Sequence, residues 1–403
     1  MIFRQNRDIF NASTAIVIST LLTFSGAAMS ATQADSKLKR SPYWSIVHHK
    51  GETPSPRIEI ASWSNNNLLF VFGGMPRLLA PLTNGSELYT YDLKTHLWKS
   101  RRQQGGGWPN GWEGASTWTT SNHIGWMFGG AGIHGNTSNL YMIDLQKQVW
   151  HFVGSGKGHG KTLLNWPQPR SLAGGWSGPN QKLYMYGGVS NKFEQIDGQV
   201  RVTSLHNLWI YSTKKEQWKR ITGPAQESHG SIGKTLRSNW PGAISFQQTW
   251  VGNHGNLWMY SGATSPNFGP SSGDLWKYDV QLSEWVYEGP DKNQKPNEKG
   301  ACHIGNPSSG CWPMKVMGAA TWTGKDGSLW MLGGTVNGSP YPNSALWEYQ
   351  PKIREWTYWG DKKRHLSTGA WPKDLVTAWK LSNGRVYAYD GYHHLYLFHF
   401  PTH

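Results

Sequence analysis

Short apolar runs that end in a small residue and a glycine recur along the chain. They read LFVFGG (69–74), WMFGG (126–130), LYMYGG (183–188), LWMYSG (257–262), LWMLGG (329–334) and VYAYDG (386–391). Runs of this length, rich in aromatic and aliphatic residues and bounded by glycine, are typical of buried β-strands. The pattern therefore predicts six copies of one β-rich unit.

A second apolar run follows each of the first five copies and ends in tryptophan at a constant spacing of seven residues. The spaced pairs are Tyr91 and Trp98, Ile143 and Trp150, Tyr211 and Trp218, Tyr278 and Trp285, and Tyr349 and Trp356. An earlier run before each glycine carries its own tryptophan, namely Trp63, Trp118, Trp176, Trp250, Trp322 and Trp379. A fixed spacing in otherwise variable copies indicates one repeated supersecondary unit, here with four short strands.

The glycine pair, the Tyr/Trp pair and a repeat length of about 50 residues resemble the kelch-repeat β-propellers, which include the central domain of galactose oxidase. The resemblance covers residues 41–403 and departs at Ser261 and Asp390, which replace the first glycine of the pair, and at Ile143 and Phe398, which replace tyrosine. It implies an all-β propeller of four-stranded blades. It selects no function, because kelch propellers include binding platforms, scaffolds and enzymes.

The repeated residues have a steric explanation. A glycine pair lets the backbone adopt a positive φ and lets neighbouring sheets approach closely, and large aromatic side chains fill the wedge between sheets that splay from an axis. Of the 25 tryptophans, only Trp112 and Trp359 fall outside the repeat positions. We therefore expect the tryptophans to pack between sheets and do not infer a sugar-stacking platform from their number.

The two ends of the repeat region are complementary. The sixth copy stops before its tryptophan, which would fall at position 405, whereas Trp44 lies in an apolar run before the first copy. We expect a strand near 43–47 to complete the sixth blade, so that the chain forms a six-bladed propeller closed by its N-terminal strand.

The first residues have the order of zones found in secretory signals. Arg4 and Arg7 precede the apolar stretch 15–24 and then the small-residue segment SGAAMSA. We interpret residues 1–31 as a signal peptide cleaved near Ser30 or Ala31, rather than as a frayed helix, and expect a periplasmic or secreted protein. No later apolar stretch reaches 18 residues, so we expect no transmembrane segment in the mature chain. We also expect the protein to be a monomer.

Cys302 and Cys311 are the two cysteines of the chain. In an oxidising compartment, a local disulfide between them is the simplest interpretation. As a zinc pair they would lack two ligands, and His303 is the one histidine nearby.

Charge suggests the class of partner. Lysine and arginine exceed aspartate and glutamate to give a net charge of +15, which favours an anionic protein or glycan partner and, less so, nucleic acid. The excess is concentrated in the long loops between blades, which we place on one face of the propeller as the candidate binding surface. The alternative is a solvated rim without a binding role. The candidate ligand-binding residues are Arg101, Arg102, Lys157, His159, Lys161, His229, Lys234, Arg237, Lys363, Arg364 and His365.

Metal and cofactor sites are not indicated. His159, His229, His303 and His365 lie in equivalent loops, but scattered loop histidines are commoner than a converging metal site, so we expect no metal. Copper-radical chemistry of the galactose oxidase kind needs a Tyr joined to a Cys, and the resemblance does not carry those residues over. No catalytic set can be selected, since its members would come from different blades.

Three functional interpretations remain at this point. We favour an exported recognition protein for an anionic glycan or an acidic protein. The alternatives are a carbohydrate-active enzyme, of the sugar mutarotase/epimerase or oxidase type, and an assembly scaffold of the cell envelope.

Overall fold

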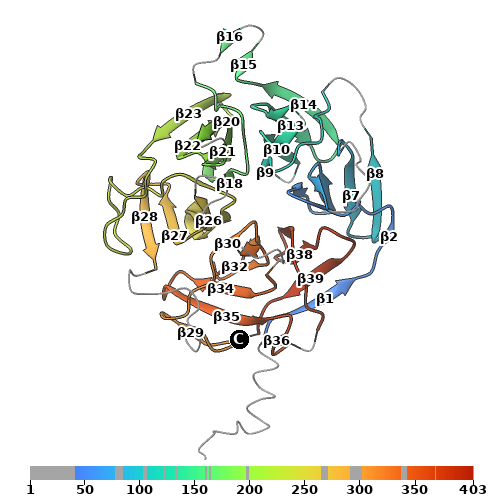
Figure 1. The fold of residues 1–403 in the computed structure, drawn as a ribbon. Coiled ribbons are helices and arrows are strands. Elements are labelled where there is room, and N and C mark those ends of the chain that lie inside the picture. Colours follow the sequence, from blue (N-terminus) through green and yellow to red (C-terminus); the bar gives the residue numbers. More distant parts are fainter. Residues whose placement is uncertain are drawn as a thin grey trace, which may run out of the picture.

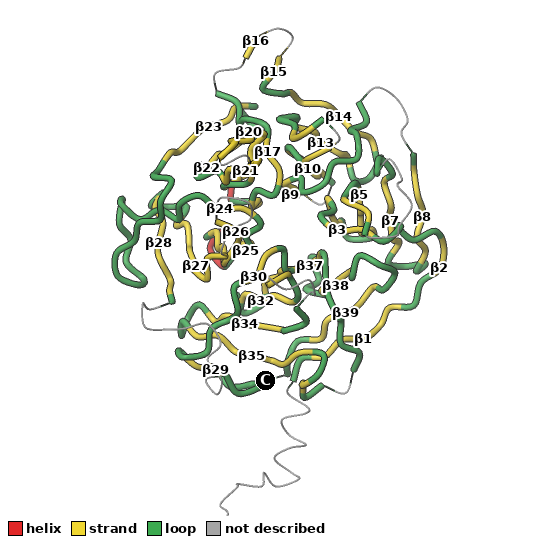
Figure 2. Tube along the Cα trace, viewed as in Figure 1, coloured by secondary structure: helices red, strands yellow, loops and turns green. Residues whose placement is uncertain are grey.

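The computed structural model describes residues 41–402, apart from 78–84, 103–106, 122, 133, 159–160, 163–164, 197–198, 265–270, 291–301, 337–342 and 368. Within this part the chain is built from strands, with two single-turn 3₁₀ segments, η1 (Pro179–Gln181) and η2 (Asn253–Gly255). Figure 2 shows strands and loops, with these short helical segments in red. The predicted signal peptide, residues 1–31, lies outside the described residues.

Most strands belong to sheets with a common core of four antiparallel strands, which we number 1 to 6 and give from the inner to the outer strand. Sheet 1 contains β4 (Ala61–Ser64), β5 (Leu68–Phe72), β7 (Leu88–Asp92) and β8 (Leu97–Arg101). Sheet 2 contains β9 (Ser116–Ser121), β10 (Ile124–Phe128), β13 (Leu140–Asp144) and β14 (Val149–Gly154). Sheet 3 contains β18 (Gly174–Ser177), β19 (Lys182–Tyr186), β22 (Asn207–Ser212) and β23 (Gln217–Thr222). Sheet 4 contains β25 (Gln248–Val251), β26 (Leu257–Thr264), β27 (Ser271–Asp279) and β28 (Glu284–Gly289). Sheet 5 contains β31 (Ala320–Thr323), β32 (Leu329–Leu332), β34 (Leu346–Gln350) and β35 (Glu355–Asp361). Sheet 6 contains β37 (Thr377–Lys380), β38 (Val386–Tyr389), β39 (Leu395–His399) and β1 (Tyr43–Val47).

Short strands connect or extend these sheets. On the outer side, β2 (Lys50–Gly51) pairs with β8, while β29 (Pro307–Ser308) and β36 (Arg364–His365) pair with β35. The other short strands are β3 (Arg57–Ile58), β6 (Met75–Pro76), β11 (Ala131–Gly132), β12 (Gly135–Asn136), β15 (Lys157–Gly158), β16 (Lys161–Thr162), β17 (Arg170–Ser171), β20 (Val189–Ile196), β21 (Gln199–Ser204), β24 (Ile244–Ser245), β30 (Val316–Met317) and β33 (Thr335–Val336).

The sheets lie around a common centre, in chain order, as in a β-propeller (Figure 1). Strand β1, from the start of the described chain, pairs antiparallel with β39, so that Trp44 lies opposite Phe398. The strand predicted near 43–47 therefore lies in the same sheet as the last strands of the chain.

Buried apolar side chains of the described residues form six clusters, and each cluster joins two neighbouring sheets. One cluster contains Phe72 of sheet 1 with Trp150 of sheet 2, and another contains Trp98 of sheet 1 with Tyr389 of sheet 6. The tryptophans of the inner and outer strands in sheets 1 to 5 and Trp379 of sheet 6 are at most 5% exposed, and Trp44 is fully buried. The prediction that they pack between sheets is confirmed.

The glycine pairs adopt the left-handed conformation that the repeat pattern predicts. Gly73 has φ +64°, and a Cβ there would collide with the main-chain carbonyl of Trp112 in the next repeat. Ser261 replaces such a glycine with φ +51°, and its hydroxyl donates to Ser272 O at 2.6 Å. This bond compensates for the less favourable backbone conformation of a residue with a Cβ.

Cys302 and Cys311 form the predicted disulfide, with their Cα atoms 4.9 Å apart. In the described part of the chain, no helix is long and apolar enough to cross a membrane.

Candidate functional site

A cavity of about 600 Å³ lies at the centre of the sheets, where the chain enters each inner strand. All six sheets contribute to it, through the residues that precede and begin β4, β9, β18, β25, β31 and β37. We call it the central cavity. Because each sheet contributes only a short segment, its lining joins residues that are far apart in the sequence.

The residue four positions before each inner-strand tryptophan lies at this cavity. In five of the six repeats that residue is left-handed, with φ from +57° to +68°: Glu59, Gly114, Leu172, Phe246 and Gly318. Their main chains are joined by hydrogen bonds, from Gly114 N to Glu59 O (2.9 Å), Leu172 N to Gly114 O (2.6 Å), Phe246 N to Leu172 O (2.9 Å) and Gly318 N to Phe246 O (3.1 Å). At the sixth equivalent position, Leu375 N bonds to Asp374 Oδ1 at 2.9 Å instead. The backbone around the cavity is therefore held between sheets, and sheet 6 departs from the pattern.

The inner-strand tryptophans show the same asymmetry. Trp63, Trp118, Trp176 and Trp250 each donate the indole N–H to a carbonyl of the next sheet, at 2.7–3.1 Å. The buried indole nitrogens of Trp322 and Trp379 have no such partner among the described residues. In the described part of the chain, the indole hydrogen bonds that join the other neighbouring sheets are therefore missing between sheets 5 and 6 and between sheets 6 and 1.

Glu59 dominates the electrostatics of the central cavity. Burial, and secondarily the nearby Glu113 carboxylate, raises the pKa of Glu59 from 4.5 to about 7. Burial also raises the pKa of Glu113. The described lining contains no lysine or arginine, and Glu59 forms no ion pair with any described residue. The cavity is acidic although the chain is basic.

Gln247 adds an unused acceptor to the cavity lining. Its side-chain amide donates to Tyr186 O at 2.9 Å, which fixes the orientation of the amide. The carbonyl oxygen Oε1 is buried and has no hydrogen-bond partner among the described residues, and the residue is only 8% exposed.

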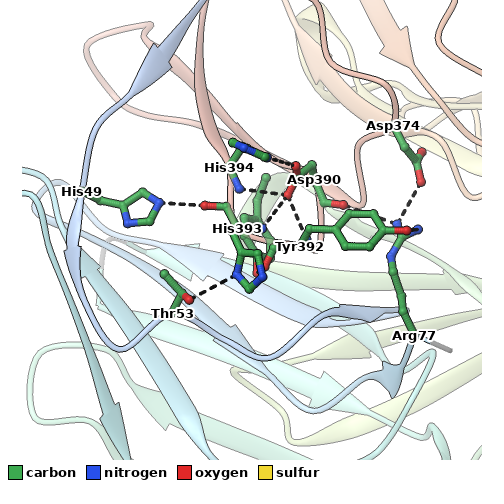
Figure 3. A network of polar contacts seen from close by, with 9 residues as sticks. His49, Thr53, Arg77, Asp374, Asp390, Tyr392, His393 and His394 are labelled. Carbon is green, nitrogen blue, oxygen red and sulfur yellow. Dashed lines mark hydrogen bonds and ion pairs between the residues drawn. The ribbon is translucent and has the colours of Figure 1, made fainter. Parts of the chain in front are cut away.

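A polar network joins sheets 1 and 6 beside the cavity (Figure 3). Arg77 forms an ion pair with Asp374 at 2.9 Å, donates to Tyr392 Oη at 3.1 Å and lies over the Tyr392 ring at 4.2 Å. Burial raises the pKa of Asp374 although the ion pair with Arg77 opposes this shift. His49 Nε2, from the chain after β1, contacts His393 O at 2.7 Å. This network adds side-chain contacts between sheets 1 and 6, which the main-chain hydrogen bond from Arg57 N to Gly391 O (2.7 Å) also joins.

The predicted basic residues lie elsewhere, on and near the outer strands. Arg101, at the end of β8, and Arg102 are exposed, and Arg102 pairs with Glu87 at 3.1 Å. Lys234 and Arg237 are exposed in the segment between sheets 3 and 4, with Arg237 pairing with Glu284 at 3.6 Å.

The remaining predicted residues are also at the periphery or outside the description. Lys363, just before β36, and Arg364, the first residue of β36, are exposed. Lys157 and Lys161 lie in the short hairpin β15–β16, which projects outward in Figure 1, and their side chains, like all of His159, lie outside the described residues. None of the predicted residues that the structure describes lines the central cavity.

The predicted histidines pack against aromatic rings. His229 stacks on Tyr287 with ring centroids 3.8 Å apart and lies 3.7 Å from a Glu227 carboxylate oxygen. His365 stacks on Trp371 at 4.5 Å. Among the described residues, no group of three or more His, Cys, Asp or Glu could hold a metal ion.

A second cavity, of about 650 Å³, lies between the loops of sheets 3 and 4 and includes Glu227, Arg220 and His206. Burial, and then the proximity of Asp274, raises the pKa of Glu227 to about 8. Because Arg220 also borders this cavity, its charge is mixed, unlike that of the central cavity.

Inspection of the residues alone did not identify Glu59, Gln247 or Asp374. Each of the three lies a few residues before an inner-strand tryptophan: Asp374 by five, Glu59 by four and Gln247 by three. The residue types at these positions differ between repeats, so a search for repeated residue types passes over them.

Comparison with known proteins supports the repeat assignment. Residues 12–236, more than half of the 403, match the family model described as the KLHDC2/KLHL20/DRC7 Kelch-repeats domain. The chain is 22% identical over 198 residues to Kelch domain-containing protein 1 of Homo sapiens, covering 44% of each protein. It is 23% identical over 202 residues to the Rab9 effector protein with kelch motifs of Mus musculus, covering 48% of this chain and 46% of that protein. These matches span less than half the length of each relative. The glycine pairs, the interlocking tryptophans and the family match together show that this chain belongs to the kelch-repeat family.

Proposed function

We propose that this chain is an exported recognition protein that binds an acidic protein partner through its basic outer surface. The main observation in support is that Lys and Arg side chains are exposed on and beside the outer strands of several sheets. Arg101 on β8, Lys219 on β23 and Lys363 before β36 are all exposed. With a net charge of +15, such a surface attracts anionic macromolecules and accelerates their association.

A protein partner is favoured over a glycan by one of the relatives. The mouse relative is named as an effector of Rab9, which assigns that protein a protein partner. For this chain we infer only that the partner is a protein.

We further propose that the six sheets close into one rigid six-bladed propeller spanning residues 41–403. Two observations support closure: the pairing of β1 with β39, and the apolar cluster shared by sheets 6 and 1. A closed ring removes exposed sheet edges between the first and last repeats and holds the loops in fixed relative positions.

Export is supported by the order of zones in residues 1–31 and by the disulfide, since disulfides persist in oxidising compartments. The mature protein, isolated from periplasm and medium, is expected to begin near Ser30 or Ala31 by intact mass. A full-length N-terminus on folded, disulfide-bonded protein would contradict export by signal cleavage.

The oxidase alternative requires a cysteine that is free to link to a tyrosine. Both cysteines of the chain form the disulfide, so neither is available for a link to tyrosine. The mutarotase/epimerase and scaffold alternatives have no specific observation in their favour.

The binding proposal is tested with poly-L-glutamate as the acidic polypeptide and heparin as the anionic glycan. The test variant reverses the charge of four outer residues, Arg101, Lys234, Lys363 and Arg364, to glutamate. The control reverses four exposed lysines of the strand-connecting turns, Lys94, Lys214, Lys325 and Lys352. Both variants have the same net charge.

We expect poly-L-glutamate to bind, to weaken as salt rises from about 50 to about 300 mM, and to lose at least about tenfold in affinity in the test variant only. Equal losses in both variants would show that net charge alone matters and would refute a defined surface. Tighter binding of heparin than of poly-L-glutamate would reassign the partner class to a glycan.

A further inference from the structure

We propose that the central cavity is a binding site for an organic ammonium group, carried by a free amine or by a lysine side chain. This goes beyond the outer basic surface, because the cavity has the opposite charge and none of the residues assigned to that surface. Its ligand would therefore be positively charged, whereas the partner of the outer surface is negatively charged.

The carboxyl group of Glu59 is the first observation behind this assignment. It lies at the cavity on a left-handed backbone, φ +57°, at a position where two other repeats have glycine. No described Lys, Arg or His compensates its charge. A largely buried carboxyl group without a counter-ion destabilises a fold, and such groups occur preferentially at functional sites.

Gln247 is the second and independent observation. Its N–H group is used by Tyr186 O, while its oxygen Oε1 is buried at the cavity lining with no donor among the described residues. A buried acceptor left unpaired is destabilising, and Gln247 is therefore a second lining residue whose hydrogen-bonding capacity is not used within the described chain. An ammonium group offers three donors and a positive charge, and it can pair with the Glu59 carboxylate.

The rest of the lining fits the alkyl part of such a ligand. Ile60, Leu172 and Val376 supply aliphatic contacts, and Ser62, Thr117 and Thr377 supply hydroxyl groups. The volume of about 600 Å³ is within the range of small-ligand sites. A bare metal ion fits less well, because the described residues include no group of three or more metal-ligating side chains.

Binding depends on the ionisation of Glu59. The other acidic groups around it are Glu113 and, in the lining from the neighbouring sheet 6, the Asp374 carboxylate, which pairs with Arg77. Since the pKa of Glu59 is about 7, its carboxyl group is mostly protonated at pH 5 and mostly ionised at pH 8. An alkylamine stays protonated over this interval. Affinity for an ammonium ligand should therefore rise with pH.

The test is isothermal titration of the full-length protein with three probes. Cadaverine represents a free amine, N-acetyl-lysine N-methylamide represents a lysine side chain, and 1,5-pentanediol is the neutral analogue of cadaverine. The test variant is Glu59→Gln. The matched control, Glu284→Gln, removes a carboxylate on the outer strand β28 that pairs with Arg237.

We expect at least one ammonium probe to bind with a dissociation constant of about 1 mM or below at pH 8, and the diol not to bind. Affinity should fall by about tenfold at pH 5 and in E59Q, and should be unchanged in E284Q. Preference for cadaverine would identify a free amine as the ligand, and preference for the lysine derivative would identify a side chain.

Three results would overturn the proposal. They are the absence of binding by both ammonium probes, equal binding of the diol, and unchanged affinity in E59Q. Because E59Q is expected to be more stable than the wild type at pH 8, misfolding cannot account for lost binding in that variant.

Discussion

Replacing Glu59 by glutamine should stabilise the protein, and the gain should depend on pH. The pKa of Glu59 rises from 4.5 to about 7 on folding, chiefly because burial disfavours the carboxylate. The difference between these two pKa values corresponds to a penalty of at most about 3 kcal/mol for the ionised form, because water that reaches the carboxyl group reduces the penalty.

The direction follows from proton binding. Between pH 4.5 and 7 the folded protein holds a proton on Glu59 that the unfolded chain has released, so the free energy of unfolding falls as pH rises through this window. Below pH 4.5 both states are protonated and Glu59 contributes no pH-dependent penalty. Glutamine is neutral at every pH, so E59Q should match the wild type near pH 4 and exceed it by up to about 3 kcal/mol at pH 8.

Urea denaturation followed by tryptophan fluorescence at pH 4, 6 and 8 measures this difference. E284Q, on the outer strand β28, serves as the control and should not show the same growing gain. A gain of equal size at all three pH values would indicate a packing effect, and a loss at pH 8 would refute the buried, unpaired carboxylate.

The other predictions concern the packing of the sheets and are all measured by urea denaturation. Trp63→Phe should lower the free energy of unfolding by about 1–3 kcal/mol, because it removes the hydrogen bond from Trp63 Nε1 to the next sheet. Trp322→Phe should lower it by less, because the indole nitrogen of Trp322 has no hydrogen-bond partner among the described residues. Equal losses would show that these hydrogen bonds do not contribute to stability. Trp44→Ala should lower the free energy of unfolding by about 3–5 kcal/mol, because Trp44 is fully buried between sheets 5 and 6. A decrease below about 1 kcal/mol would contradict its packing role. Replacing Cys302 and Cys311 by serine should lower the free energy of unfolding by about 3 kcal/mol, because the disulfide, with a sequence separation of 9, restricts the unfolded chain. A reducing agent should lower the stability of the wild type by the same amount and leave the variant unchanged.

The repeat pattern made most of the fold predictable. Glycine pairs and tryptophans recur because the same steric problem, close packing of splayed sheets, recurs in each repeat. Trp44 could be assigned to the last sheet because the sixth copy ends before its own tryptophan, and β1 does pair with β39. The disulfide was predictable because the chain has two cysteines close in sequence.

The central cavity was not predictable in the same way. Its lining comes from equivalent positions, but Glu59, Gly114, Leu172 and Phe246 share a backbone conformation rather than a residue type. The left-handed φ and the hydrogen bonds between sheets are properties of the assembled structure. A search for repeated chemistry passes over a site that each repeat supplies with a different side chain.

The loop charges were identifiable by residue but not by position. Arg101, Lys234 and Lys363 were expected to gather on one loop face, and the structure places them on or beside the outer strands, away from the central cavity. A sequence shows that such residues occur in equivalent loops, but the direction in which each loop leaves its sheet decides whether their side chains converge.

The outer surface and the central cavity should therefore act independently. An inner and an outer strand of one sheet are separated by three strand spacings of about 4.8 Å, or about 14 Å, which exceeds the Debye length of about 8 Å at physiological salt. Outer lysines and arginines thus do little to neutralise Glu59. Combining E59Q with the outer charge reversals should change ammonium affinity and poly-L-glutamate affinity by no more than each variant does alone, since distant sites are additive to within about 0.5 kcal/mol. A larger coupling would mean that the basic loops reach toward the cavity and that the two sites recognise parts of one ligand.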